Sequence, residues 1–249
     1  MIDLHCHIIP WVDDGADDAE TACKMAAHAV RSGVTTVVAT PHCNLRGALP
    51  NYRGRGYDRR LAMFRALLRQ HRIPLKVLPG AEVFAHPDNL RTLLAHRRLV
   101  TLNHSHYLLV EFDFGSPGDE ITRLLGMIAE YGLTPVVAHP ERYDAVQAAP
   151  ELAMHWFSEG CLLQLNKGSL LHRLGDGAYE TSMLLLRRGF ADVIASDAHD
   201  TYYRPSGFQS LLPVLERYCA PAYVRLLLEQ NPARILSDRR ISRKIEDPI

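Results

Sequence analysis

The sequence predicts an α/β fold in which a parallel sheet closes into a single barrel surrounded by helices. Two observations support this fold class. Seven short stretches with strand composition alternate with stretches of helical periodicity, and parallel neighbours need such crossover connections. The 249 residues also show no internal repeat, low-complexity run or long linker, and this length is ordinary for one such barrel. We therefore expect one domain over residues 1–249.

The strands are predicted from short β-branched and apolar runs. In the first run, apolar Ile2 and Leu4 alternate with polar residues, as in a half-buried strand. Residues two apart in an extended segment share a face, so His5 and His7 can reach one metal ion together. The other strands are expected at residues 34–39, 75–78, 107–112, 134–138, 161–165 and 191–195.

The helices are predicted from apolar residues that recur three or four positions apart. The first follows this spacing over residues 22–30, and Gly33 is placed to end it. Asp58 is placed to cap the second, which continues through Leu68. A charged tail is expected over residues 237–249. The remaining helices are expected at residues 87–96, 121–128, 151–159, 179–188, 208–218 and 222–229.

Side chains of the kinds that bind metals stand at the ends of the predicted strands. A barrel of parallel strands presents its chemistry at the carboxyl ends of those strands. His5 and His7 alone would fit a polar strand end equally well, but the recurrence along the chain indicates a metal site. Imidazole and carboxylate without thiolate favour manganese, iron or zinc over a structural zinc knot. The strand-end residues are His5, His7, His42, Glu82, Glu111, His139, Asn166, Asp197 and His199.

Composition excludes several classes of function. Lysine and arginine together number 28, as do aspartate and glutamate, so no overall charge attracts the chain to nucleic acid or to a membrane surface. The chain has no apolar run long enough to span a membrane, and it does not begin like a signal peptide. The five cysteines are scattered and never in CxxC spacing. We therefore expect reduced thiols and a cytoplasmic location.

A set of motifs in a fixed order resembles a known family. The chain resembles the polymerase and histidinol phosphatase (PHP) superfamily. Within it, the chain is most similar to the bacterial capsule and exopolysaccharide protein-tyrosine phosphatases of the CpsB/YwqE type. The motifs are DLHCH at residues 3–7, VDDG at 12–15, TPH at 40–42, GAE at 80–82, LVEF at 109–112, AHPERY at 138–143 and ASDAH at 195–199.

The resemblance implies a distorted (β/α)7 barrel that holds up to three divalent ions, most often manganese. It assigns the first ion to His5, His7, Glu82 and Asp197. It assigns the second to Glu82, Glu111 and His139, with Glu82 bridging the two ions. It assigns the third to Asp14, His42 and His199. Arg142 and Arg204 match the phosphate-binding arginines of the family.

The implied activity is hydrolysis of phosphotyrosine by a metal-bound hydroxide, without a phosphoenzyme. The implied substrate is the tyrosine-rich tail of a bacterial tyrosine kinase that controls capsule or exopolysaccharide synthesis. The alternative is a phosphatase for a small metabolite such as histidinol phosphate. A nuclease or polymerase-associated barrel is disfavoured by the neutral charge. A catalytically inactive binding module would need a broken ligand set, and no expected ligand is missing.

Further stretches offer alternatives to this interpretation. Cys219 and Arg225 have the CxxxxxR spacing of cysteine-dependent phosphatases, but the stretch lacks the glycines that such a phosphate loop needs. Residues 46–60 are basic and form either a solvated loop and helix start or a rim that attracts an acidic tail. Residues 43–50 and 166–168 depart from the family pattern, and both are candidates to line the substrate entrance.

Overall fold

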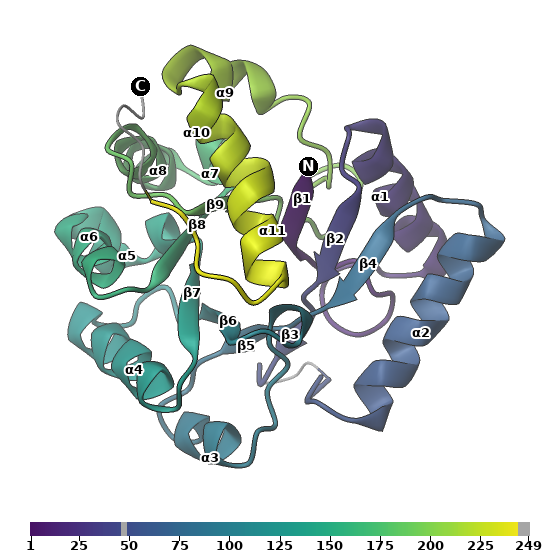
Figure 1. Ribbon diagram of the computed structural model, residues 1–249, viewed down its shortest axis with the longest axis horizontal. Helices are drawn as coiled ribbons and strands as arrows, with labels where there is room; N and C mark the ends of the chain where they lie inside the picture. The colour runs from purple at the N-terminus through teal and green to yellow at the C-terminus, as the bar shows by residue number, and fades with distance from the viewer. Residues whose placement is uncertain (46–48, 244–249) are drawn as a thin grey trace.

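The protein is an α/β barrel with parallel strands, and its computed structural model describes residues 1–45 and 49–243 (Figure 1). Strand pairing gives two parallel sheets, with orders β1-β2-β4 and β3-β5-β6-β7-β8-β9. The described strands are β1 (Ile2–Cys6), β2 (Thr36–Ala39), β3 (His42–Cys43), β4 (Lys76–Pro79), β5 (Glu82–Phe84), β6 (Tyr107–Glu111), β7 (Thr134–Ala138), β8 (Leu162–Asn166) and β9 (Val193–Ala195).

The predicted second and third strands are each followed by a further short strand that was not predicted. β2 ends before Thr40-Pro41 and β3 begins at His42, while β4 ends before Gly80 and β5 begins at Glu82. Pro41 has no backbone N–H to donate to a ladder. At Gly80 a Cβ atom would lie 2.5 Å from Val38 Cγ1, so the neighbouring strand requires a glycine there. These breaks transfer the chain from the first sheet to the second.

The first strand lies beside the last one. Cys6 and Ala198 form an isolated parallel bridge. The amide of His7 donates to the Ala198 carbonyl at 2.8 Å, and the amide of Asp197 donates to the His5 carbonyl at 2.8 Å. The residues that follow β9 therefore pack directly against the end of β1.

Helices cover the outside of the strands. Gly33 adopts a φ of 85° directly after the first helix, as predicted for a helix end. The prediction that Asp58 caps the second helix is wrong, because this helix begins at Arg55, after Gly54. The α-helices are α1 (Ala19–Arg31), α2 (Arg55–Gln70), α3 (Leu90–Ala95), α4 (Gly118–Glu130), α5 (Asp144–Ala148), α6 (Glu151–Ser158), α7 (Lys167–Leu170), α8 (Asp176–Arg187), α9 (Leu212–Tyr218), α10 (Pro221–Arg225) and α11 (Asn231–Leu236).

Shorter helical segments complete the fold. The predicted helix over 222–229 is α-helical only in α10 and then becomes a π-helical turn, η3 (Leu226–Gln230), which runs into α11. Two 3-10 turns are present: η1 (Leu102–His104) precedes β6, and η2 (Pro140–Arg142) follows β7. Within the described residues, no helix combines the length and the apolar character needed to cross a membrane.

The end of the barrel formed by the amino ends of the strands is closed by α11, which crosses the strands in Figure 1. Asn231 donates to the Asp192 carbonyl just before β9, and Asn103 donates to the Leu236 carbonyl just before β6. Ile235 packs inside the barrel with apolar side chains of the strands. The opposite end of the barrel, at the carboxyl ends of the strands, is not covered by α11.

The predicted charged tail is only partly described. In its first part, Arg243 packs against the barrel wall and pairs with the buried Asp192 at 2.8 Å. Residues 244–249 lie outside the described part of the chain.

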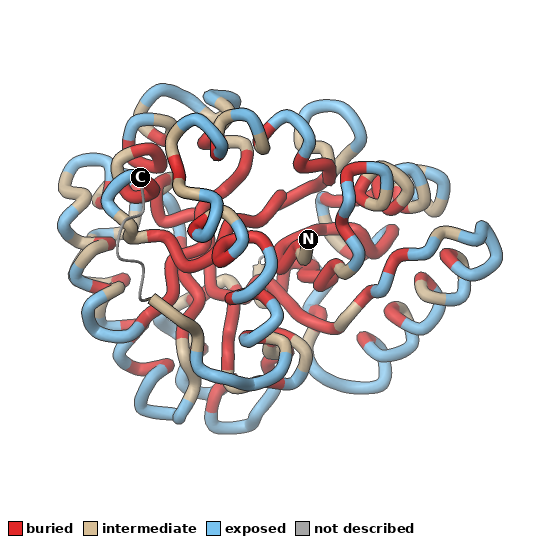
Figure 2. Tube along the Cα trace, turned by 45° about the horizontal axis from the view of Figure 1, so that its top comes forward, coloured by how far each residue is buried: buried red, intermediate tan, exposed pale blue. Residues whose placement is uncertain are grey.

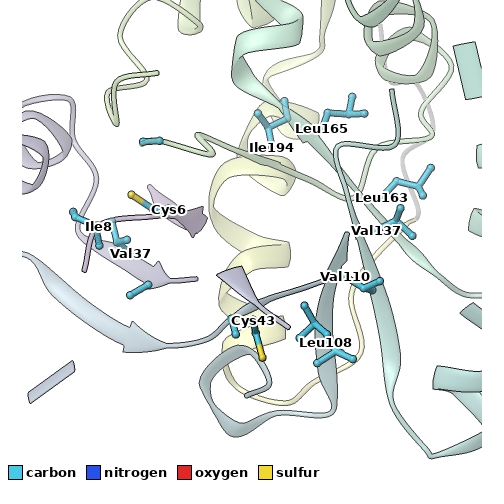
Figure 3. Packing of buried hydrophobic residues seen from close by; sticks show 14 of the residues in the cluster. Cys6, Ile8, Val37, Cys43, Leu108, Val110, Val137, Leu163, Leu165 and Ile194 are labelled. Atoms are coloured by element: carbon cyan, nitrogen blue, oxygen red, sulfur yellow. The ribbon is translucent and has the colours of Figure 1, made fainter. Parts of the chain in front are cut away.

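Alternation along the strands separates a packing face from an inner face. The outward side chains, including Val37, Leu108, Val110 and Ile194, pack in the core between strands and helices (Figure 3). Figure 2 shows the strands buried and the outer turns of the helices exposed. On the inner face of β6, apolar Leu109 is followed two residues later by Glu111. The inner face thus changes from apolar to ligand-type side chains towards the carboxyl ends.

Candidate metal centre

Side chains from the strand ends converge on three overlapping groups that can hold metal ions. Within each group the ligand atoms lie within 4.8 Å of one another. Eight of the nine predicted ligands belong to these groups, and His139 adjoins them through contacts with Glu82 and Glu111. The groups are His5, His7, Glu82 and Asp197; His42, Glu82 and Glu111; and His7, Asp14, His42 and His199.

The first group is fully buried and tightly packed. The Nε2 atoms of His5 and His7 are 3.1 Å apart, so both imidazoles face the same point. Glu82 Oε2 lies 3.2 Å from each of these nitrogens. Asp197 Oδ1 lies 3.3 Å from His5 Nε2 and 3.6 Å from His7 Nε2. Two imidazoles and two carboxylates are a donor set suited to a divalent transition metal.

Hydrogen bonds on the far sides of the rings orient these two histidines. His5 Nδ1 lies 2.8 Å from Gln164 Oε1, and His7 Nδ1 lies 2.7 Å from Asp13 Oδ2. Both partners are acceptors, so each Nδ1 carries the proton and each Nε2 presents its lone pair to the centre. Gln164 was missed at the sequence level because it lies inside a strand. Its inward position, two residues before Asn166, was the signal that could have found it.

The second group extends the site along three neighbouring strand segments. Glu82 Oε2 lies 3.2 Å from His42 Nδ1, and Glu111 Oε2 lies 3.6 Å from the same nitrogen. His139 Nε2 lies 3.1 Å from Glu82 Oε1 and 3.6 Å from Glu111 Oε1. Glu82 therefore directs one oxygen to each side, which is the arrangement that a bridging carboxylate requires.

The third group lies nearest to solvent. Asp14 Oδ1 is 3.3 Å from His42 Nε2 and 3.5 Å from His199 Nε2. The ring of His199 stacks on that of His7 at 3.9 Å between centroids. Asp14 has a side chain that is 63% exposed, whereas both of its histidine partners are buried. This group is thus open on one side.

The electrostatics of the centre fit bound cations. Burial would raise the pKa of Glu82, yet the surrounding imidazoles hold it well below its usual range. Burial, together with the charges of Glu82 and Asp197, raises the pKa of Glu111 well above its ordinary value. Within the described part of the chain, several buried atoms that face the centre have no hydrogen-bond partner, namely His42 Nδ1, Asp197 Oδ1 and His199 Nε2. Divalent cations would neutralise the crowded carboxylates and would coordinate the unpaired buried ligand atoms.

The two predicted phosphate-binding arginines meet at one carboxylate. An Arg204 guanidinium nitrogen lies 2.5 Å from Asp197 Oδ2, and an Arg142 nitrogen lies 3.7 Å from the same oxygen. Asn166 also donates to Asp197 Oδ2, at 2.6 Å. These donors occupy Oδ2 and leave Oδ1 facing the histidines. Arg142 does not pair with Glu141, whose carboxylate is buried and accepts from the Asn166 amide.

The structure also settles the place of other stretches singled out in the sequence. Cys219 is buried, and burial raises the pKa of its thiol to about 11, which is unsuited to a thiolate nucleophile. Lys167 is buried and donates to the carbonyls of Pro205 and Gly207, so it does not line an entrance. Of the basic stretch, residues 46–48 lie outside the described part of the chain, and Arg55 begins α2.

Comparison with known proteins agrees with this geometry. The family model for capsular polysaccharide synthesis proteins of the CpsB/CapC type matches residues 1–237. Tyrosine-protein phosphatase YwqE of Bacillus subtilis is 34% identical over 249 residues, which cover 100% of this chain and 96% of the relative. Tyrosine-protein phosphatase CpsB of Streptococcus pneumoniae is 29% identical over 246 residues, covering 97% of this chain and 100% of the relative.

Solved structures give the same assignment. A crystal structure from work on YwqE of Bacillus subtilis and CpsB of Streptococcus pneumoniae, described as metal-dependent tyrosine phosphatases, superposes with a TM-score of 0.89. The sequences are 33% identical, and the match covers 100% of this chain and 99% of that one. The phosphotriesterase of Mycobacterium tuberculosis shares the fold alone, with a TM-score of 0.62 at 14% identity over 95% of this chain and 94% of that one. The chain thus belongs to the CpsB/CapC family of capsular polysaccharide synthesis proteins.

Proposed function

We propose that this protein is a metal-dependent protein-tyrosine phosphatase. The observation that carries the proposal is the convergence of three overlapping ligand groups beneath two arginines at one end of the barrel. Relatives of similar length are named tyrosine-protein phosphatases. Bound divalent ions, with manganese the first candidate and iron or zinc the others, would neutralise the phosphoryl charge and lower the pKa of a coordinated water towards 7.

The residues of the centre take distinct parts in this proposal. One ion would be held by His5, His7, Glu82 and Asp197. A second would be held by Glu82, Glu111 and His139, with His42 Nδ1 3.2 Å from Glu82. A third would be held by Asp14, His42 and His199, and the exposure of Asp14 would leave this position open to substrate.

Arg142 and Arg204 bind the phosphoryl group of the substrate. A guanidinium fork can contact two phosphoryl oxygens at once, and both forks lie against the Asp197 carboxylate at the centre. The phenolate of tyrosine has a pKa of about 10, so its departure does not require a strong general acid. The arginines therefore orient the ester, and the protein need not supply a strong general acid for the leaving group.

The physiological substrate in this proposal is the tyrosine-rich tail of a bacterial tyrosine kinase that controls capsule or exopolysaccharide synthesis. The family's connection with capsular polysaccharide synthesis supports this choice. All five cysteines are free thiols, which suits the reducing cytoplasm in which we place the reaction.

Substrate comparison tests the proposal. The manganese-loaded protein is assayed with a phosphotyrosine peptide and with histidinol phosphate under identical conditions. We expect kcat/KM for the peptide to exceed that for histidinol phosphate by at least about tenfold. Equal or faster turnover of histidinol phosphate would replace this proposal with a metabolite phosphatase.

A pair of variants tests the arginine assignment. Arg142→Ala is expected to raise KM for the phosphotyrosine peptide by at least about tenfold, because a charge-assisted contact to the phosphoryl group is lost. Its metal content should remain that of the wild type. Arg188→Ala, which removes an exposed arginine at the end of α8, is the control and should leave KM unchanged.

A further inference from the structure

Exposed aromatic and apolar side chains are concentrated at the end of the barrel that carries the metal centre. Among the described residues, seven large hydrophobic side chains are exposed, namely Trp11, Leu49, Met63, Phe114, Tyr131, Tyr202 and Tyr203. Five of these seven, all but Met63 and Tyr131, lie on loops that follow β1, β3, β6 and β9. Because these loops leave the carboxyl ends of the strands, the side chains lie at the same end of the barrel as the centre.

The turn after β9 is ordered by hydrogen bonds and carries two exposed tyrosines. Asp200 Oδ1 accepts hydrogen bonds from the amides of Tyr202 at 2.5 Å, Tyr203 at 2.6 Å and Arg204 at 3.2 Å. This turn sends Arg204 inward to Asp197. The tyrosine side chains remain 77% and 78% exposed, with their rings 4.9 Å apart. One ordered turn therefore delivers a phosphate-binding arginine and two solvent-facing aromatic rings.

Phe114 lies against the other candidate phosphate-binding arginine, Arg142. The Arg142 guanidinium carbon lies 4.4 Å from the centre of the Phe114 ring. The same ring meets His139 edge to face at 5.8 Å between centroids. Phe114 nevertheless remains 37% exposed. An aromatic surface thus adjoins both a candidate metal ligand and a candidate phosphate-binding residue.

A hollow lies beside the strands that carry the second ligand group. This hollow of about 520 Å³ includes Asn44, Phe84 and Asp113 among its lining residues. Each of these residues follows a ligand-group residue, His42, Glu82 or Glu111, by two positions along neighbouring strands. The hollow therefore lies at the carboxyl ends of β3, β5 and β6, the same strands that carry the second ligand group.

We propose that Trp11, Phe114, Tyr202 and Tyr203 form an aromatic rim that binds the polypeptide segment on either side of the substrate phosphotyrosine. The inference rests on the proposed function and adds the structural feature that selects a polypeptide. A compact, hydrophilic phosphate ester would reach the arginines and leave the rim in water. A phosphopeptide complements both parts, because its phosphate meets Arg142 and Arg204 while its apolar flanking side chains cover the rim. Exposed aromatic side chains supply large contact areas at low conformational cost, which is why they dominate binding surfaces.

The test compares substrates that do and do not reach the rim. Manganese-loaded protein is assayed with phenyl phosphate and with a phosphotyrosine peptide that carries leucine residues on both sides. The readout is the ratio of kcat/KM for the peptide to kcat/KM for phenyl phosphate. The double variant Tyr202→Ser/Tyr203→Ser is expected to lower this ratio about tenfold, mainly through KM for the peptide. Trp11→Asn, on a different loop, should lower it in the same direction.

The control is Tyr131→Ser, which removes an exposed tyrosine that follows α4 at the opposite end of the barrel. It should keep the wild-type ratio. If both rim variants kept the wild-type ratio, including by losing activity equally on the two substrates, the proposal of a peptide-binding rim would be wrong. The proposed phosphatase function would still stand. A wild-type protein that hydrolyses neither substrate with metal present would instead contradict the proposed function, and the rim with it.

Discussion

Hydrogen bonds to the outer ring nitrogens determine how the central histidines face the metal centre. Gln164 accepts from the His5 ring, and Asp13 accepts from the His7 ring and from the backbone amides of His42 and Gly15. Neither Gln164 nor Asp13 belongs to the ligand groups themselves. Partners of this kind fix the ring tautomer, and their loss typically costs 10–100-fold in metal affinity.

Gln164→Leu is therefore expected to weaken metal binding about tenfold or more, since it leaves His5 Nδ1 buried without an acceptor. Competitive titration against a metal chelator measures the change. Gln164→Glu keeps the acceptor and should lose less affinity than the leucine variant. If both variants lost affinity equally, the orienting role of Gln164 would be wrong.

The cysteine at the start of the CxxxxxR spacing provides a second prediction. Cys219 is buried between α9 and α10, outside the ligand groups. Cys219→Ala should retain the wild-type kcat for a phosphotyrosine peptide within about twofold. An inactive but folded and metal-loaded Cys219→Ala protein would point to a thiolate mechanism instead.

At the scale of elements, Lys167 connects the end of β8 to the loop that carries Arg204. Its ammonium group donates to the carbonyls of Pro205 and Gly207, while its side chain is buried beside Phe208. This contact holds the loop against the barrel. Lys167→Met is expected to raise KM for a phosphotyrosine peptide several-fold while metal content remains at the wild-type level. A variant that lost metal instead would show that Lys167 supports the ligands rather than the loop.

The same lysine gives a prediction about pH. Burial lowers the pKa of Lys167 to about 8, below its ordinary value of 10.5. Between these two values the unfolded chain binds more protons than the folded one, so this group makes stability rise as pH increases from about 8 to 10.5. Chemical denaturation across this range should show the rise in the wild type relative to Lys167→Met. Parallel stability curves for the two proteins would contradict the assignment.

Elements also show what sequence patterns can and cannot predict. Strand ends were predictable because β-branched runs are followed by His, Glu or Asp, as at His42, Glu82 and His139. The short strands β3 and β5 were not predicted, because the break before β5 depends on how closely Gly80 approaches Val38 in space. The contact of Gln164 with His5 and the burial of Lys167 likewise depend on packing between segments distant in sequence.

In the whole molecule, the apolar side chains inside the barrel and the ligand-type side chains lie at opposite ends. Apolar side chains fill the inner face near α11, while carboxylates and imidazoles gather at the other end. The exposed aromatic rim has no local signature in the sequence, because its residues come from separate loops and their exposure emerges only in the folded chain.

Crowding of carboxylates at the centre predicts that metal ions stabilise the entire fold. Chelation should lower the melting temperature, because ions that bind only the folded state add about 2.7 kcal/mol at a free concentration of 100 Kd. Differential scanning calorimetry with and without manganese measures the shift. Asp197→Asn should reduce it, since Asp197 is a member of the first ligand group. An equal melting temperature with and without metal would contradict this coupling.

The most direct measurement determines metal content and phosphotyrosine-peptide turnover in the same samples of wild type and His7→Ala. We predict that the wild type binds divalent ions, loses turnover when they are chelated and regains it when manganese is returned. His7→Ala should lose both metal and turnover, because His7 belongs to two of the ligand groups. Full turnover by a wild-type protein stripped of metal would contradict the account.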